Sequence, residues 1–72
     1  MEEESIQELF GNRIQHIRKK IGLSQEKLAL KIGMDRTYNA SVESGKRNIS
    51  LGNIKKIADG FDISISKLFE EI

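Results

Sequence analysis

The side chains best suited to bind another molecule gather in the middle of the chain. If residues 36–44 form a helix with about 100° between successive residues, Arg36, Thr37 and Ser41 share one face, and the small Ala40 lies between them. A guanidinium and two hydroxyls suit the edges of bases in a DNA major groove, where threonine or alanine can also contact a thymine methyl. The same residue types are ordinary on a solvated helix, so both interpretations stay open at this point.

Catalytic chemistry has no comparable cluster in the sequence. His16 is the only histidine, the chain has no cysteine, and no nucleophile is paired with a base. The dipeptide Gly45-Lys46 lacks the earlier glycine and the following Ser or Thr of a phosphate-binding loop. We therefore expect no enzyme, no metal and no cofactor, and we expect His16 to lie on the surface.

The composition limits the chain to one small domain. With 72 residues and no cysteine, it depends on a compact apolar core or on self-association for its stability. No apolar run approaches the roughly 20 residues that span a bilayer. The start Met-Glu-Glu-Glu-Ser is acidic, where a secretion signal is basic. We expect a single domain over residues 1–72 in the cytoplasm, with no membrane contact and with residues 1–4 disordered.

Charge is distributed unevenly, although the net charge is only +1. Residues 1–12 contain four acidic residues and no basic one, residues 13–47 contain nine basic and three acidic residues, and residues 48–72 contain three basic and four acidic residues. A positive middle between negative ends indicates one surface that faces a polyanion. The alternative is that Lys and Arg merely solvate helix faces.

Apolar residues recur at intervals of three and four, which is the period of a helix, and the chain has no proline. We expect an all-α fold of five short helices. Serine or aspartate precedes each of the last four, where it can cap the helix N-terminus. The expected helices cover about residues 5–21, 25–33 and 36–44, then a fourth from residue 51 to near residue 60, and a last one at about 64–72.

The second and third helices are separated only by Gly33-Met34-Asp35. A three-residue turn that contains glycine is typical of a helix-turn-helix, here at about residues 25–44. Ala29 is small where the helices should cross, Gly33 can adopt the left-handed conformation of a helix exit, and Val42 is apolar on the inner face. The pair therefore predicts that the third helix is presented to a ligand by the second.

Residues 9–69 resemble the Cro and phage-repressor type of helix-turn-helix domain, also known as the xenobiotic-response-element family. The matching segments are "GLSQEKLALKIGM", "DRTY", "VESGKRNIS" and "NIKKIADGFDISISKLF". Within that family, "DRTY" followed by "VESGKRN" is most similar to the controller proteins of bacterial restriction-modification systems. The resemblance implies a five-helix phage-repressor-like fold and a sequence-specific dimeric transcription regulator that binds double-stranded DNA.

The resemblance also implies roles for named residues. The base-reading positions are Arg36, as the main guanine reader, Thr37 and Tyr38, which contact bases or the backbone beside it, and Ser41, which reaches the wall of the groove. Backbone-contacting positions are Gln25, Lys46, Arg47 and Asn48. The alternative for Tyr38 is a half-buried ring that closes the core, and the alternative for Lys46 and Arg47 is a solvated loop.

Asn39 departs from the family, which has Ile, Leu or Val at this position. A polar group buried there without partners costs about 1–3 kcal/mol. One hypothesis places Asn39 at the rim of the core, bonded to backbone or water; a second rotates the third helix so that the amide reads an adenine. An altered sequence is a third possibility. We favour the rim, because this position lies nearer Val42 than the reading face.

The end of the chain carries more apolar surface than one short helix needs. We expect a symmetric homodimer through Ile63, Ile65, Leu68, Phe69 and Ile72, with intramolecular docking as the alternative. A twofold dimer presents two recognition helices about 34–36 Å apart, which predicts an inverted-repeat operator. The bound dimer, at the bacterial nucleoid, would block a promoter or activate RNA polymerase.

Glu43 is a candidate for the polymerase contact, and its alternative is an ion pair with a neighbouring base. The competing function for the whole chain is a stand-alone repressor or an antitoxin-like protein-interaction module of the same fold.

Overall fold

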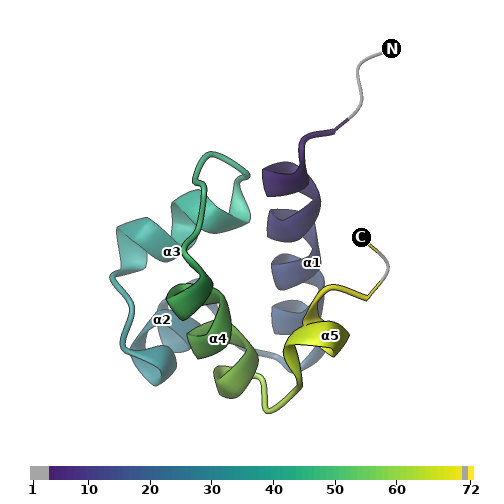
Figure 1. Ribbon diagram of the computed structural model, residues 1–72. Helices are drawn as coiled ribbons and strands as arrows, with labels where there is room; N and C mark the ends of the chain where they lie inside the picture. Colours follow the sequence, from purple (N-terminus) through teal and green to yellow (C-terminus); the bar gives the residue numbers. More distant parts are fainter. Residues whose placement is uncertain (1–3, 71) are drawn as a thin grey trace.

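Five helices and the turns between them make up the computed structural model, which describes residues 4–70 and residue 72 (Figure 1). No strand occurs in the described residues, and the expectation of an all-α fold is confirmed. The expected disorder of residues 1–3 lies outside the described part, whereas the Glu4 carboxylate accepts a hydrogen bond from Asn12 Nδ2 at 2.9 Å. The helices are α1 Ile6–Lys20, α2 Gln25–Ile32, α3 Arg36–Glu43, α4 Leu51–Gly60 and α5 Ile65–Leu68.

Side-chain caps determine where the helices begin. In every helix the preceding residue accepts a hydrogen bond from the backbone N–H three positions ahead, and these caps are Ser5, Ser24, Asp35, Ser50 and Ser64. Each such cap contributes about 1 kcal/mol to stability. Ser5 and Glu8 form a reciprocal capping box, so α1 begins after Ser5 rather than at it.

The core lies where the inner faces of the helices meet. Figure 1 shows α2 and α3 on one side, α1 and α5 on the other, and α4 between them. None of the helices in the described part of the chain is long and apolar enough to cross a membrane. The buried apolar cluster consists of Phe10, Ile14, Leu28, Val42, Ile54, Ile57, Ala58, Phe61 and Leu68.

A glycine lets α1 and α3 approach each other closely. Gly11 is buried, and a Cβ added there would lie 2.5 Å from the carbonyl oxygen of Glu43 and 2.6 Å from that of Val42. Both oxygens belong to backbone, which cannot move aside as a flexible side chain can. The close approach also allows Gln15 Nε2 to donate a hydrogen bond to the Glu43 carbonyl at 2.9 Å. The end of α3 is therefore held directly against α1.

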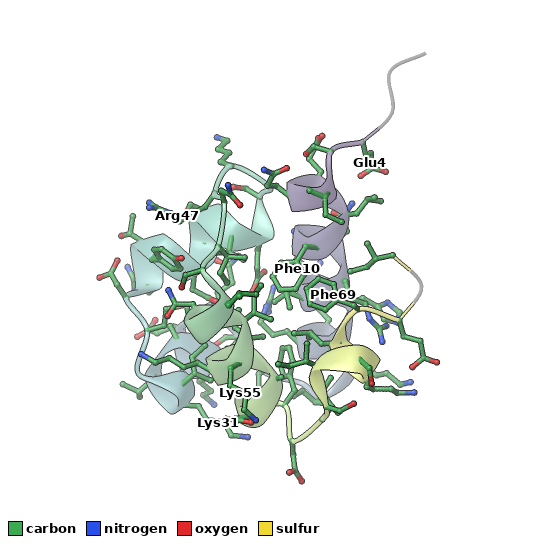
Figure 2. The ribbon with its side chains drawn as sticks, in the orientation of Figure 1. Glu4, Phe10, Lys31, Arg47, Lys55 and Phe69 are labelled. Carbon is green, nitrogen blue, oxygen red and sulfur yellow. The ribbon has the colours of Figure 1, made fainter. Side chains whose placement is uncertain are left out.

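The last helix is shorter than the sequence indicated, because α5 ends at Leu68 and not at residue 72. Phe69 follows as a C-cap, and its ring stacks on Phe10 of α1 with 5.1 Å between centroids and 28° between planes. Figure 2 shows Phe10 and Phe69 close together beside α1. An aromatic pair of this kind stabilises the fold beyond its area burial, and it joins the residue after α5 to α1.

Candidate nucleic-acid interface

The turn between α2 and α3 has the predicted geometry. Gly33 has φ 67° and ψ 34°, a left-handed conformation that glycine adopts without strain. Asp35 Oδ2 then accepts a hydrogen bond from the backbone N–H of Tyr38 at 3.1 Å, which fixes the start of α3. Ala29 of α2 is buried, as expected for the small residue of the pair. The turn confirms the helix-turn-helix expected at about residues 25–44.

The outer face of α3 is the one that the sequence predicted. Arg36 and Thr37 are exposed, whereas Ala40 and Ser41 are half-buried beside them. Val42 is buried on the opposite face, where it joins the core. The first turn of α3 therefore offers a guanidinium and a hydroxyl to a molecule that approaches from outside.

A groove between the beginnings of α2 and α3 brings together residues that are well separated in the sequence. Gln25, the first residue of α2, lines the groove with Arg36 and Thr37 of α3. The first backbone N–H groups of α2 also lack a carbonyl partner within their own helix, and such a terminus favours anions. The groove has a volume of about 580 Å³, and its other lining residues are Arg18, Ser24, Glu26 and Ala40.

Arg36 is held by an acidic neighbour in the free chain. Its Nη1 lies 3.2 Å from Glu26 Oε2, and the two side chains are 69% and 72% exposed. An ion pair this exposed contributes at most about 1 kcal/mol, so the guanidinium can leave Glu26 for a stronger partner at little cost. Sequence reasoning did not find this contact, which depends on the angle between α2 and α3.

Ser41 serves an internal role that its position on the helix did not reveal. Its hydroxyl donates to the carbonyl of Tyr38 at 2.7 Å and accepts from Arg47 Nε at 2.9 Å. The Arg47 guanidinium also lies over the Tyr38 ring, with Cζ 4.5 Å from the ring centroid. Ser41 therefore positions Arg47 in the free chain, rather than holding its hydroxyl ready for a base.

The segment after α3 is exposed, with Lys46, Arg47 and Asn48 accessible to solvent. Figure 2 shows Arg47 at the outer edge of the molecule beside α3. The backbone N–H of Lys46 donates to the Ser41 carbonyl at 3.0 Å, so the loop is tied to the helix. One further contact was not predicted: Asn53 of α4 donates from Nδ2 to the Tyr38 hydroxyl oxygen at 3.0 Å.

A buried ion pair stands behind the groove. Arg18 of α1 donates from Nε to Glu43 Oε2 at 2.8 Å and from Nη2 to Oε1 at 3.0 Å. Gln25 Nε2 donates to the same Oε1 at 3.0 Å. Since an amide nitrogen carries two hydrogens, Gln25 keeps one N–H for a ligand while Glu43 orients its amide.

The structure contradicts the suggestion that Glu43 contacts RNA polymerase. The residue is only 1% exposed, and both carboxylate oxygens are occupied by Arg18 and Gln25. The alternative of a neighbouring basic partner is the correct one. That partner is 25 residues away in the sequence, on another helix, and a pattern within one helix could not have identified it.

Asn39 lies in the interior and not at the rim of the core, so that expectation is wrong. It is 0% exposed, and its Nδ2 reaches only the Gln25 carbonyl, at 3.5 Å. Its Oδ1 has no hydrogen-bond partner among the described residues. Full burial also contradicts the alternative in which the amide reads a base. The contact with backbone that the rim hypothesis included is present, but at the limit of hydrogen-bond distance.

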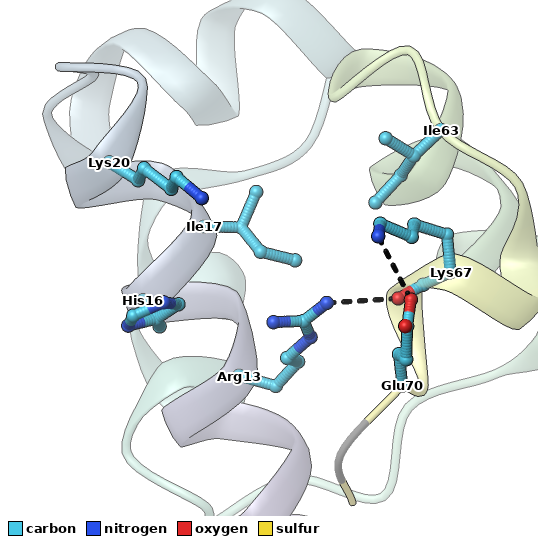
Figure 3. Close-up of a pocket in the computed structure, with 7 residues that line it drawn as sticks. All are labelled: Arg13, His16, Ile17, Lys20, Ile63, Lys67 and Glu70. Atoms are coloured by element: carbon cyan, nitrogen blue, oxygen red, sulfur yellow. Dashed lines mark hydrogen bonds and ion pairs between the residues drawn. The ribbon is translucent and has the colours of Figure 1, made fainter.

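The C-terminal segment is docked on α1 through an arginine. Arg13 donates from Nε to the Leu68 carbonyl at 3.2 Å and from Nη2 to the Lys67 carbonyl at 3.0 Å. Figure 3 shows Arg13 reaching across to α5, where Lys67 pairs with Glu70 at 3.0 Å. A basic side chain suits these carbonyls because they carry the negative end of the helix dipole. His16, beside this cleft, is exposed as expected.

The apolar residues expected at a dimer interface divide into two groups. Leu68 is fully buried in the core, which removes it from any surface that a partner could cover. Ile63 and Phe69 are half-buried against the core. Ile65 and Ile72 are 42% and 37% exposed. Among the five residues expected at the interface, these two apolar side chains are the most accessible to a partner.

Comparison with known proteins gives concordant results. A family described as helix-turn-helix matches residues 14–68. The control protein C.MunI of Mycoplasma sp is 52% identical over 64 residues, which are 88% of this chain and 86% of that protein. The control protein C.BamHI of Bacillus amyloliquefaciens is 40% identical over 67 residues, 92% of this chain and 83% of that protein.

Solved structures agree with these matches. The restriction-modification controller protein C.AhdI from Aeromonas hydrophila superposes with a TM-score of 0.85 at 48% identity, covering 88% of this chain and 96% of that one. A second controller protein, C.Esp1396I, was solved as a tetramer in complex with its natural 35 base-pair operator. It superposes with a TM-score of 0.85 at 32% identity over 94% of this chain and 90% of that one.

Proposed function

We propose a function from the premise that this chain belongs to the helix-turn-helix family and, within it, to the restriction-modification control proteins. The protein is a dimeric, sequence-specific DNA-binding regulator of transcription that recognises inverted-repeat operators. The observation that carries this proposal is the groove in which Gln25, at the N-terminus of α2, lies beside Arg36 and Thr37 at the start of α3.

In this proposal α3 enters the major groove. Arg36 leaves the exposed pair with Glu26 and donates two hydrogen bonds to guanine O6 and N7, while Thr37 contacts a neighbouring base. Gln25 donates its remaining amide N–H to a phosphate, together with the backbone N–H groups of α2. We assign the base-reading role to Arg36 and Thr37, with Tyr38 beside them at the edge of the base contacts.

The loop after α3 supplies the second phosphate contact. Lys46, Arg47 and Asn48 are exposed there, and Ser41 holds Arg47 by its Nε. A guanidinium has five N–H donors, so four remain for a phosphate after Ser41 has taken one. Contacts of this kind fix the register of the protein on the duplex without reading sequence. The proposed role of Ser41 is therefore to position Arg47 and not to contact a base.

We propose that two copies associate through the C-terminal segment, using Ile65 and Ile72 with the exposed parts of Ile63 and Phe69. One recognition helix covers only a few base pairs, whereas a twofold dimer places two in successive major grooves. The dimer acts in the cytoplasm at the nucleoid and regulates by occupying a promoter. A contact with RNA polymerase would use a surface other than Glu43.

Selection from a random duplex pool tests this function. The protein is incubated with the pool at near-physiological salt, and the bound fraction is sequenced. We expect enrichment of an inverted repeat with half-site centres about one helical turn apart, or a multiple of it. The Arg36→Ala variant, whose substituted side chain is exposed and leaves the core intact, is expected to lose that enrichment.

The competing function is a protein-interaction module of the same fold. Affinity measured against salt concentration separates the two, because DNA binding weakens steeply as counterions are released and an apolar protein interface does not weaken in this way. A folded protein that enriches no sequence and shows no salt-dependent DNA binding would refute the proposed regulator.

A further inference from the structure

Four side chains from three segments form one hydrogen-bonded group, which we call the Tyr38 cluster: Tyr38 and Ser41 from α3, Arg47 from the loop, and Asn53 from α4. Arg47 stacks on the Tyr38 ring and is bonded to Ser41, and Ser41 in turn donates to the Tyr38 carbonyl. Asn53 approaches from the other end of the ring and donates to the phenol oxygen at 3.0 Å. The ring is therefore held along its face and at its tip.

The contact from Asn53 sets the direction in which Tyr38 can hydrogen-bond. An amide NH₂ group can only donate, so the phenol oxygen accepts from Asn53 and its own proton must point elsewhere. Among the described residues, the Tyr38 hydroxyl makes no hydrogen bond in which it is the donor. Tyr38 is thus left as a hydrogen-bond donor with an unused proton, on the same cluster that carries the exposed guanidinium of Arg47.

A donor of this kind suits a partner that can only accept hydrogen bonds. Phosphate oxygens are acceptors only, and half to two-thirds of protein–DNA hydrogen bonds go to phosphate and sugar. We propose that Asn53 is a positioning residue for DNA binding, which holds the Tyr38 hydroxyl as a donor to a phosphate oxygen of the bound duplex. The assignment rests on the proposed function, and it adds to the interface a residue of α4 that does not itself touch DNA.

The hydrogen bond from Asn53 to the Tyr38 hydroxyl also affects Arg47, which stacks on the Tyr38 ring. Because the guanidinium lies on the Tyr38 face, a ring held at its tip gives Arg47 a fixed platform, and the two η nitrogens, which Ser41 does not use, can donate to a phosphate. Less rotamer freedom is then lost when DNA binds, which improves affinity without any new contact.

The role of Asn53 can be separated from folding. Asn53 is half-buried near the start of α4, and its backbone N–H donates the capping hydrogen bond to Ser50 Oγ at 3.2 Å, a contact that does not involve the Asn53 side chain. Alanine has a higher helix propensity than asparagine, so Asn53→Ala is expected to leave the fold intact. Tyr38→Phe removes only the hydroxyl and keeps the ring on which Arg47 stacks.

A double-mutant cycle tests the inference. The affinity of the wild-type protein, Asn53→Ala, Tyr38→Phe and the double variant is measured for the duplex that the wild-type protein selects from the random pool. We expect Tyr38→Phe to weaken binding about tenfold, as for one hydrogen bond to a charged acceptor, and Asn53→Ala to weaken it about fivefold. In the Tyr38→Phe background, Asn53→Ala is expected to have an effect of less than about twofold.

A measurement without DNA accompanies the cycle. Tyr38 is the only tyrosine, and the chain has no tryptophan, so the tyrosine doublet of the Raman spectrum reports this one phenol. We expect the doublet of the wild-type protein to show that the phenol oxygen accepts a hydrogen bond. In Asn53→Ala the doublet is expected to lose this signature.

The outcomes distinguish the inference from the function on which it rests. If the wild-type protein selects no duplex, the proposed function is refuted and the role of Asn53 is refuted with it. If a duplex is selected but Asn53→Ala weakens binding by the same factor with and without the Tyr38 hydroxyl, only the role of Asn53 is refuted. An unchanged Raman doublet in Asn53→Ala would refute it as well.

Discussion

Replacing Asn39 by isoleucine should stabilise the protein. The Asn39 side chain is fully buried, and its Oδ1 has no partner among the described residues. A buried polar atom left in this state costs about 1–3 kcal/mol, and the 3.5 Å contact of Nδ2 recovers little of it. Isoleucine removes that cost, but its side chain is larger than that of asparagine. If the core cannot adjust, overpacking of this kind costs about 1–3 kcal/mol. We expect a net gain of about 1 kcal/mol.

For a domain of this size, that gain raises Tm by about 4–8 °C. The assay is thermal unfolding followed by circular dichroism, at one fixed protein concentration because self-association makes Tm depend on concentration. Asn39→Val serves as a smaller variant that avoids overpacking, and Asn39→Asp, which buries a charge in the same shape, should lower Tm. The reasoning would be refuted if Asn39→Ile and Asn39→Val both left Tm unchanged or lowered it.

Two further substitutions test the packing behind the interface by chemical denaturation. Glu43→Gln leaves the buried Arg18 guanidinium without its counter-charge and should lower the free energy of unfolding by about 3–5 kcal/mol. Its control is Asp59→Asn at an exposed ion pair, where a loss below about 1 kcal/mol is expected and an equal loss would contradict the argument. Gly11→Ala places a methyl group 2.5 Å from a backbone oxygen and should destabilise the fold by about 1–3 kcal/mol. Gly52→Ala, with nothing within 4 Å of the added Cβ, should instead stabilise the fold. The test is that the two variants change the free energy of unfolding in opposite directions.

The helix boundaries and the recognition face could be predicted because they depend on local chemistry. Ser24, Asp35 and Ser50 cap the helices that follow them, and Gly33 makes the exit from α2, each through atoms only a few residues apart. Helical periodicity then orients α3, so that Arg36 faces outward and Val42 inward. These features follow from short-range hydrogen bonds and side-chain spacing.

The contacts that the sequence did not reveal join residues on different helices. Glu43 pairs with Arg18 across 25 positions, and Asn53 reaches Tyr38 across 15. Neither contact produces a periodic pattern, because each depends on the crossing geometry of two helices. The predicted end of α5 is also wrong: the apolar residues fit a longer helix, whereas the helix ends at Leu68 and the Phe69 ring stacks on Phe10, a residue 59 positions earlier that periodicity within one helix cannot identify.

Asn39 illustrates a different limit. Its angular position nearer Val42 than the reading face was visible in the sequence, but that position does not tell the rim of the core from its interior. The structure instead places it between α2 and α3, with a weak bond to the Gln25 carbonyl. The Asn39→Ile substitution measures how much it costs to bury the unpartnered Oδ1 of Asn39 at this position.

The central claim is that the exposed face of α3 reads DNA sequence while the loop after α3 holds the backbone. The most direct test compares Arg36→Ala and Arg47→Ala on the selected duplex and on a scrambled duplex of the same composition, at one salt concentration. Arg36→Ala is predicted to weaken binding to the selected duplex by about 1–3 kcal/mol and to leave binding to the scrambled duplex nearly unchanged. Arg47→Ala should weaken both by a similar factor. Equal losses on both duplexes for Arg36→Ala would contradict base reading by α3.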